Sequence, residues 1–196
     1  MKAIECPRYG PPEVLRLIQV EKPTPRADEV LIRVVATTVH VGDVRIRTFD
    51  VPRGQRLLAR LVLGFRRPKH PILGMELAGV VESVGSEVTL FTTGDEVLGF
   101  TGWHFGAYAE YTCLPEKPRK SAEKDGMLAV KPANMTFEEA AKDDRPCGPL
   151  RGVVGAGRIT AVIDRTCRLD RAGEARGYLT WHARARVGIA VGDVAT

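Results

Sequence analysis

The stretch from Glu29 to Thr38, which reads EVLIRVVATT, decides the fold class of this chain. Val30, Ile32 and Val34 fall on one side of an extended backbone and Arg33 falls on the other. This two-residue period is typical of a strand that buries one face. The stretch therefore predicts a half-buried β-strand.

Further strands are predicted at close spacing along the next part of the chain. Leu77–Val84 alternates in the same way, the Gly94-Asp95 turn precedes a strand at Glu96–Gly99, and Gly106 begins another strand that runs through Tyr111. Strands this close together, with no helix between them, favour an antiparallel barrel or sandwich over a parallel sheet. We therefore expect a mainly β fold with flanking helices.

The order of these segments resembles the medium-chain dehydrogenase/reductase superfamily, and within it the zinc-independent quinone-oxidoreductase branch. The likeness is carried by residues 1–4 (MKAI), 8–15 (RYGPPEVL), 29–34 (EVLIRV), 71–81 (PILGMELAGVV), 94–97 (GDEV), 106–111 (GAYAEY), 131–132 (KP) and 135–141 (MTFEEAA). The resemblance implies a GroES-like, partly open antiparallel β-barrel. It also implies an oxidoreductase that reduces quinones or activated alkenes, or oxidises alcohols, with NAD(P)H.

The likeness stops after Ala141 and resumes near Gly157. We therefore expect one GroES-like domain over residues 1–196, formed by 1–141 and 157–196, with a short junction at 142–156 where relatives carry a Rossmann domain. The glycines of Gly152–Gly157 are spaced in the reverse order of a dinucleotide fingerprint, which favours a loop or a helix end there. After the junction, strands are predicted at Ile159–Ile163 and Val187–Val191, with a weak helix at Leu169–Trp181 between them.

Composition and charge indicate an ordinary globular chain. Apolar residues make up 44% and charged residues 27%, as in most soluble domains. The four cysteines form no C-x-x-C pair, which indicates reduced thiols. The first residues do not resemble a signal peptide and no apolar run reaches the length of a membrane span, so we expect a cytoplasmic protein.

The net charge of +5 raises the question of an anionic partner. An apolar stripe at helical spacing, with arginines on the other faces, predicts a basic amphipathic helix; the stripe is Leu57, Leu58, Leu61, Val62 and Phe65, and the arginines are Arg53, Arg56 and Arg60. Such a helix could lie on an anionic membrane or pack its apolar stripe on its own domain. We expect packing on the domain and no membrane. We also expect no nucleic acid, because no aromatic stacking platform or recognition motif accompanies the charge.

The resemblance shows which residues would have to bind zinc and which cofactor to expect. Zinc-dependent relatives carry a cysteine at the position of His40 and a histidine at the position of Met75, and catalytic zinc needs three protein ligands. We therefore expect no zinc. NADP is the cofactor that the family implies, but without its binding domain no tight binding is expected. Glu76, inside an apolar strand, is expected to pair with an arginine, since a buried carboxylate needs a partner.

The catalytic residues are unknown from the sequence, because the cofactor carries the hydride in this branch. The resemblance places His40 and Asp43 in a cleft that holds substrate or nicotinamide, although a surface loop with Asp43 as a helix cap fits the residues equally well. Phe65, Trp103 and Phe105 are the candidates for an aromatic wall of that cleft, with a turn packed on the barrel rim as the alternative. Because the neighbouring domain is missing, we expect this face to be covered by self-association, by a partner or by the re-routed segment Cys147–Gly157.

Two functions remain open. The first is the reduction of a small-molecule quinone or enone, with this chain inactive alone. The second is a stand-alone GroES-like binding module, or a truncated gene product, without hydride chemistry.

Overall fold

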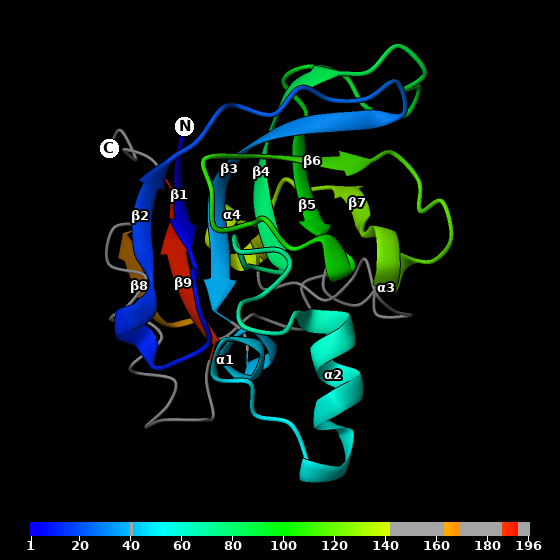
Figure 1. Ribbon diagram of the computed structural model, residues 1–196. Coiled ribbons are helices and arrows are strands. Elements are labelled where there is room, and N and C mark those ends of the chain that lie inside the picture. The colour runs from blue at the N-terminus through cyan, green and yellow to red at the C-terminus, as the bar shows by residue number, and fades with distance from the viewer. Residues whose placement is uncertain (40, 142–162, 169–185, 192–196) are drawn as a thin grey trace.

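The computed structural model describes residues 1–39, 41–141, 163–168 and 186–191. The described strands are β1 (Lys2–Glu5), β2 (Arg16–Gln19), β3 (Glu29–Val39), β4 (Glu76–Val84), β5 (Glu96–Phe100), β6 (Tyr111–Pro115), β7 (Met127–Val130), β8 (Ile163–Arg168) and β9 (Arg186–Ala190). The described helices are α1 (Val41–Thr48), α2 (Arg56–Leu63), α3 (Ala122–Asp125) and α4 (Phe137–Ala141), with short 3-10 turns η1 (Pro12–Val14), η2 (Arg53–Gln55) and η3 (Gly102–His104). Figure 1 shows strands dominating the fold, which confirms the predicted mainly β class.

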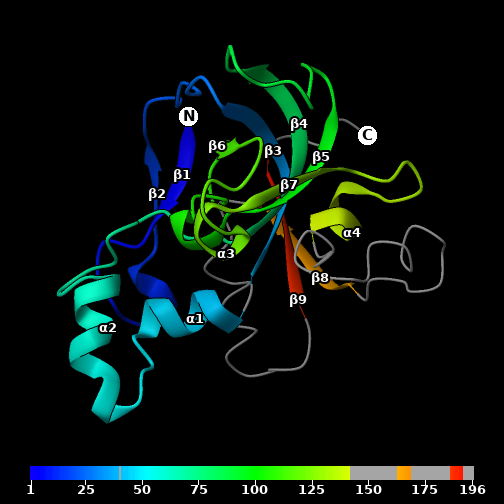
Figure 2. The same cartoon turned by 90° about the vertical axis from the view of Figure 1, so that its right-hand side faces the viewer.

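Strand β3 organises the main sheet. Along one edge it pairs antiparallel with β4. Along the other edge its first half, Glu29–Arg33, pairs with β6, and its second half, Ala36–Val39, pairs with β9. Register shifts interrupt the β3–β4 ladder at two places, and such irregularities bend a strand and increase its twist. The sheet therefore curls into the half-open barrel that Figures 1 and 2 show.

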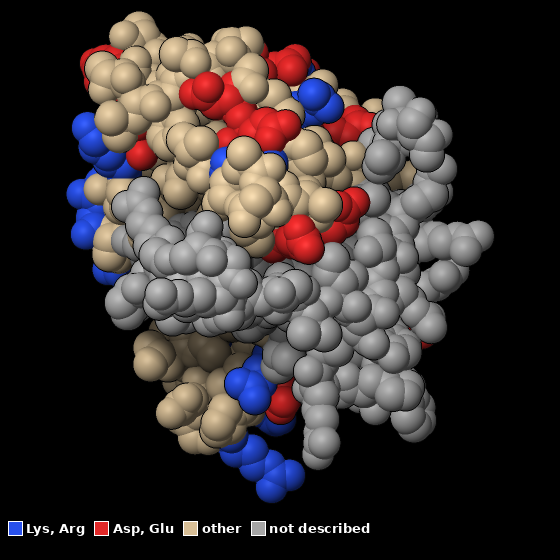
Figure 3. All heavy atoms as spheres, turned by 180° about the vertical axis from the view of Figure 1, so that it is seen from behind, with Lys and Arg blue, Asp and Glu red and all other residues tan. Residues whose placement is uncertain are grey.

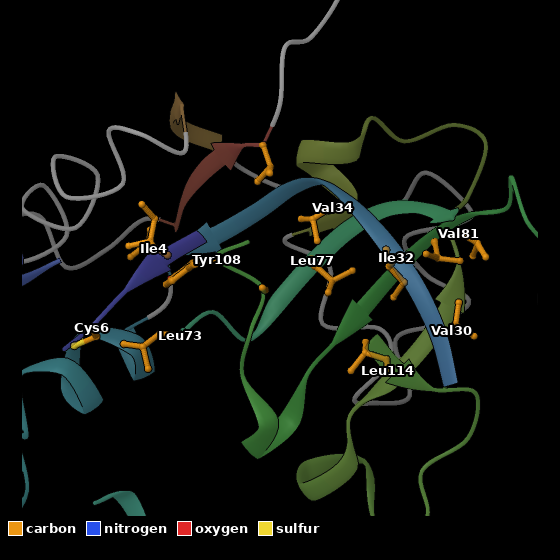
Figure 4. Close-up of a cluster of buried hydrophobic side chains, with 14 of the residues drawn as sticks. Ile4, Cys6, Val30, Ile32, Val34, Leu73, Leu77, Val81, Tyr108 and Leu114 are labelled. Atoms are coloured by element: carbon orange, nitrogen blue, oxygen red, sulfur yellow. The ribbon is translucent and has the colours of Figure 1, made fainter. Parts of the chain in front are cut away.

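The core fills the inside of this curl. Ile32 and Val34 of β3 meet Leu77 and Val81 of β4, and each is at most 2% exposed (Figure 4). Close strand contact requires Gly79, since a Cβ at that position would lie 2.2 Å from the carbonyl oxygen of Arg33. The alternation seen in the sequence therefore corresponds to the buried face of the barrel.

Helix α4 covers the outer side of the sheet at β3, β4 and β5. Ala140 and Ala141 pack there on Ala36, Ala78 and Leu98 in a second, smaller cluster. Helices α1 and α2 lie instead at one end of the sheet, and α2 stands away from the strands in both ribbon views (Figures 1 and 2). That end of the molecule is where the aromatic pocket described below is found.

One strand prediction was wrong. The predicted strand from Gly106 to Tyr111 is irregular backbone, and β6 begins only at Tyr111. Phe105 and Gly106 both have positive φ, 56° and 100°, so the chain turns sharply at this point. The following segment then bonds outside the main sheet, with the amide of Tyr108 donating to the carbonyl of Leu73 at 3.0 Å.

The C-terminal part returns to the barrel through β9. This strand pairs antiparallel with β3 and parallel with β8. Just after it, the amide of Val191 donates to the carbonyl of Val35 at 2.8 Å. The predicted last strand is therefore present. The predicted helix at 169–181 and the junction at 142–156 lie outside the described residues, so the domain boundaries stay a prediction.

Candidate functional site: an aromatic pocket beside helix α2

Asp43 in the first turn of α1 anchors that helix to the barrel. Its side chain is fully buried and accepts hydrogen bonds from the amide of Gly74, at 3.1 Å, and from the hydroxyl of Tyr108, at 2.8 Å. Gly74 has φ 97° and packs so closely on Tyr108 that a Cβ would lie 2.8 Å from its ring. Asp43 is therefore part of a buried junction, and it is not in the lining of either pocket described below.

His40 lies outside the described residues, so its predicted role stays a prediction. Near it in the sequence, the hydroxyl of Thr38 donates to the Glu76 carboxylate, and the hydroxyl of Thr37 donates to the Glu76 carbonyl at 2.6 Å. Glu76 is 8% exposed, as its place in an apolar strand predicts. Its expected arginine partner stays a prediction.

The turn after β5 carries the aromatic side chains of the site. Thr101 fixes this turn through two hydrogen bonds. Its amide donates to the carbonyl of Met75 at 2.7 Å, and its hydroxyl donates to the carbonyl of Gly74 at 3.1 Å. η3 follows, and the rings of Trp103 and Phe105 meet edge to face with centroids 6.4 Å apart. Trp103 remains 48% exposed, whereas Phe105 is 5% exposed. The turn therefore presents a ring surface to solvent on a rigid base.

These rings form one wall of a pocket of about 480 Å³, called here the aromatic pocket. α1 contributes Ile46, α2 contributes Val62 and Leu63, and the chain before α3 contributes Lys120. The described lining is Ile46, Val62, Leu63, Pro68, Lys69, His70, Leu73, Trp103, His104, Phe105, Lys120, Lys124 and Asp125. The pocket thus joins apolar and aromatic walls to a cluster of basic side chains.

The structure brings together two of the predicted site residues and separates the others. Trp103 and Phe105 line the aromatic pocket, whereas Phe65 is 63% exposed and does not belong to the described lining. His70, Lys120 and Lys124 were not predicted as site residues. They come from segments far from Trp103 in the sequence, and no motif marks them.

A second pocket of about 460 Å³ lies on the other side of His70, His104 and Phe105, which line both. One of its basic side chains is paired: Arg119 binds Asp28 through two 2.6 Å hydrogen bonds and contacts Glu29, which also lines the pocket, at 3.1 Å. Burial, aided by Glu29, raises the pKa of the Cys113 thiol to about 11. This second pocket therefore carries a neutral thiol and a closed ion-pair network.

Helix α2 is the predicted basic helix, but the expectation that its apolar stripe packs on the domain was wrong. Leu57, Leu58, Leu61 and Val62 are 51% to 70% exposed. The inner side of the helix is basic instead, since the Arg60 guanidinium lies 4.3 Å from the centre of the Phe49 ring and 5.4 Å from that of Tyr9. This cation–π packing turns the apolar stripe toward solvent.

Arg47 does not contribute to a basic surface, because its side chain is fully buried and donates a hydrogen bond to the carbonyl of Gly10. On the face seen from behind, acidic side chains gather above the residues drawn in grey, and basic ones lie along the edge and below (Figure 3). The positive charge is therefore distributed unevenly over the described part of the surface.

The described part of the chain shows neither a cluster of metal ligands nor a membrane-spanning helix. There, no three His, Cys, Asp or Glu side chains gather closely enough to hold a metal ion. None of the helices described has the length and apolar character needed to cross a bilayer.

The described residues do not fit a dinucleotide. Pyrophosphate binding requires a strand, a glycine-rich turn and a helix whose first turn faces the phosphates. β3 does lead into α1, but that first turn carries only Gly42, and Asp43 places a carboxylate there. A carboxylate at this point repels phosphate. The described residues therefore offer no pyrophosphate site of this kind at the start of α1.

Comparisons with known proteins agree with the fold. Residues 26–120 match the family model for the alcohol dehydrogenase GroES-like domain. The chain is 34% identical over 149 residues to a 2-methylene-furan-3-one reductase of Solanum lycopersicum, covering 72% of this chain and 33% of the relative. It is 33% identical over 149 residues to an NADPH-dependent alkenal/one oxidoreductase of Arabidopsis thaliana, again covering 72% and 33%.

Among solved structures, a quinone oxidoreductase from Coxiella burnetii matches with a TM-score of 0.59 and 26% identity, over 86% of this chain and 48% of that one. The chain thus spans about a third of the length of the two curated relatives and about half of the solved one. The family-model match, the relatives and the curled sheet agree with one another. The chain therefore belongs, through its GroES-like domain, to the medium-chain dehydrogenase/reductase superfamily.

Proposed function

We propose that this chain is the substrate-side domain of an NADPH-dependent reductase of quinones or activated alkenes, and that the aromatic pocket holds the flat acceptor. The observation that carries the proposal is the convergence of Trp103 and Phe105 on one pocket of about 480 Å³. Pockets of this size with apolar and aromatic walls suit small flat ligands. The relatives named above, which act as reductases of an alkenal, a furanone or a quinone, support this acceptor class.

The chemistry divides between two parts. In the complete reaction NADPH gives up a hydride and solvent supplies a proton, so that a quinone becomes a hydroquinone and NADP⁺ leaves. Trp103 would stack on the acceptor, and Ile46, Val62 and Leu73 would keep water from its apolar face. Because the described residues do not fit a dinucleotide, we propose that the chain alone binds the acceptor and does not reduce it.

Trp103 provides a direct test, because the chain contains only two tryptophans and quinones quench indole fluorescence on contact. In the Trp181→Phe variant, titration with duroquinone is expected to quench Trp103 fluorescence saturably. Trp103→Phe, which keeps Trp181, is the control for collisional quenching. If the quenching of Trp103 is linear and no stronger than that of free N-acetyltryptophanamide, the pocket does not bind quinones and the proposal is wrong.

A stand-alone binding module is the second candidate, and the lack of fit between the described residues and a dinucleotide favours it. In that case the same pocket would bind its ligand without any partner domain. An excess of a separately expressed nucleotide-binding half from a relative distinguishes the two: restored NADPH oxidation supports the reductase, whereas saturable quinone binding without any restored turnover supports the module.

A further inference from the structure

The aromatic pocket carries a concentration of positive charge that its acceptor role does not require. Three lysines and two histidines line it, against a single acidic side chain: Lys69, Lys120, Lys124, His70 and His104, with Asp125. A quinone ring needs only a flat apolar wall and one or two hydrogen bonds. The basic cluster therefore calls for a separate explanation.

Asp125 offsets only part of the charge of the cluster. Its carboxylate accepts hydrogen bonds from the backbone amides of Lys120 and of Ser121, the latter at 3.1 Å. These amide bonds, the first from Lys120, hold the pKa of Asp125 below its ordinary value. The Asp125 carboxylate is bonded to the backbone before α3. The described lining therefore has three lysine charges and only one carboxylate.

Lys69 is held close to this cluster. Its ammonium group donates to the carbonyl of Leu61 at 2.7 Å, which ties the lysine to helix α2. On the opposite side of the pocket Lys120 and Lys124 are exposed and four residues apart. Positive charge therefore faces the pocket from two separate elements.

His70 responds to this field. Burial is the first cause that lowers its pKa below the ordinary value, and the positive charges of His104 and Lys69 lower it further. Beyond the effect of burial, His104 and Lys69 therefore lie close enough to disfavour a further positive charge at His70. An anion in the pocket would relieve that repulsion.

The ring surface and the charge are adjacent. The centre of the His70 ring lies 6.1 Å from that of Phe105 and 6.3 Å from that of His104. The ring centres of Phe105 and Trp103 are 6.4 Å apart. A flat ring stacked on Trp103 would therefore present its edge to the lysines and histidines. The second pocket is also lined by basic side chains, Arg26 and Arg119, but there Arg119 is bound by Asp28 and Glu29, whereas the three lysines of the aromatic pocket form no ion pair among the described residues.

We infer that the aromatic pocket selects flat acceptors that carry an anionic group, such as a sulfonate, carboxylate or phosphate, on the edge of the ring. This inference rests on the proposed function and narrows its substrate class. The anion is held by Lys120 and Lys124, and Lys69 and His70 complete the positive field. Neutral quinones of the same size bind more weakly.

The test compares two inert ligands that differ in charge: anthraquinone-2-sulfonate and neutral 2-(hydroxymethyl)anthraquinone. Both are titrated against Trp103 fluorescence in the Trp181→Phe chain at low and high salt. The sulfonate is expected to bind about fivefold to tenfold more tightly at low salt, because exposed charge pairs each contribute only a few-fold. High salt should remove most of this advantage and leave the neutral ligand unchanged.

The variants Lys120→Gln and Lys124→Gln are expected to remove the preference for the sulfonate without weakening the neutral ligand. Lys117→Gln is the matched control, since that lysine is 67% exposed and is not in the described lining of the pocket. In NMR titrations the sulfonate should raise the pKa of His70 toward its ordinary value, and the neutral ligand should not.

The outcomes separate this inference from the proposed function. Equal, salt-independent binding of both ligands overturns the inference and leaves the quinone site standing. A failure of both ligands to bind overturns both. A loss of affinity for both ligands in the lysine variants would show a structural role for these side chains, and that result also overturns the inference.

Discussion

The hydroxyl of Tyr108 lies 2.8 Å from the Asp43 carboxylate, and this contact joins helix α1 to the barrel core. The same hydroxyl lies 3.0 Å from the carbonyl of Thr38 at the end of β3. Both side chains are fully buried. The contact fixes the segments on which the aromatic pocket is built, because Gly74 and Leu73 bond to the same two residues.

Tyr108→Phe removes the hydroxyl and keeps the ring. We expect it to lower the free energy of unfolding by about 1 to 3 kcal/mol, since a buried carboxylate loses a donor. Urea denaturation followed by circular dichroism measures the change. A Tyr108→Phe, Asp43→Asn double-mutant cycle isolates the contact, and strict additivity of the two single effects would contradict the coupling.

Lys131 gives a second stability test. Its side chain is 5% exposed, its ammonium lies 2.9 Å from the Glu96 carboxylate, and it donates to the carbonyl of Met135 at 2.7 Å. Lys131→Met should cost about 2 kcal/mol, because buried acceptors lose a charged donor. Lys22→Met, which breaks the exposed pair with Glu82, is the control and should barely move the melting temperature. Equal losses in the two variants would contradict this ranking.

Cys113 should be unreactive near neutral pH. Because its pKa is raised to about 11 in the folded chain, from an ordinary value near 9, its thiolate fraction at pH 8 is roughly 100-fold lower than in the unfolded chain. Alkylation with iodoacetamide, read at the Cys113 peptide by mass spectrometry, should therefore be slow in the native protein and fast in urea. The stability contributed by the neutral thiol is present below pH 9 and is lost as the pH rises through 11. Rapid native labelling at pH 8 would show that this pKa is not raised.

We expect the exposed stripe of α2 to drive self-association at high protein concentration. Sedimentation velocity should show oligomers that increase with salt, because Arg56, Arg66 and Arg67 repel one another across a contact between copies. The double variant Leu57→Gln, Leu61→Gln should be monomeric, and glutamine keeps the helix propensity of leucine.

The matched control is Leu17→Gln, since Leu17 is 49% exposed on β2 and does not belong to this stripe. It should associate like the parent chain. Association that persists unchanged in the α2 double variant would assign the contact to another surface.

The sequence predicted the strands well where a two-residue period and a turn residue agreed. β3, β4 and β5 follow the alternation at Glu29–Thr38 and Leu77–Val84 and the turn at Gly94. The prediction of a strand at Gly106–Tyr111 was wrong, because the positive φ of Phe105 turns the chain there and an apolar run does not reveal that conformation. Local patterning therefore specified most of the barrel, and the exceptions arose from turns.

The site was harder to predict than the fold. Helical spacing shows which residues of α2 share a face, but it does not show which face meets the domain, and here Arg60 packs on Phe49 and Tyr9. Trp103 and Phe105 were predicted because aromatic residues between glycines stand out in a sequence. Lys120, Lys124 and His70 meet them only through the tertiary fold, so no spacing could have identified them.

The most direct test of the central claim is NADPH oxidation by this chain alone, followed at 340 nm with duroquinone as acceptor. Because the described residues hold no site for the dinucleotide, we predict a rate equal to that of the protein-free control at low and at high salt, under conditions in which Trp103 fluorescence reports bound quinone. Saturable NADPH oxidation that is insensitive to salt would contradict the account, because it would show that this chain supplies both the acceptor site and the cofactor site.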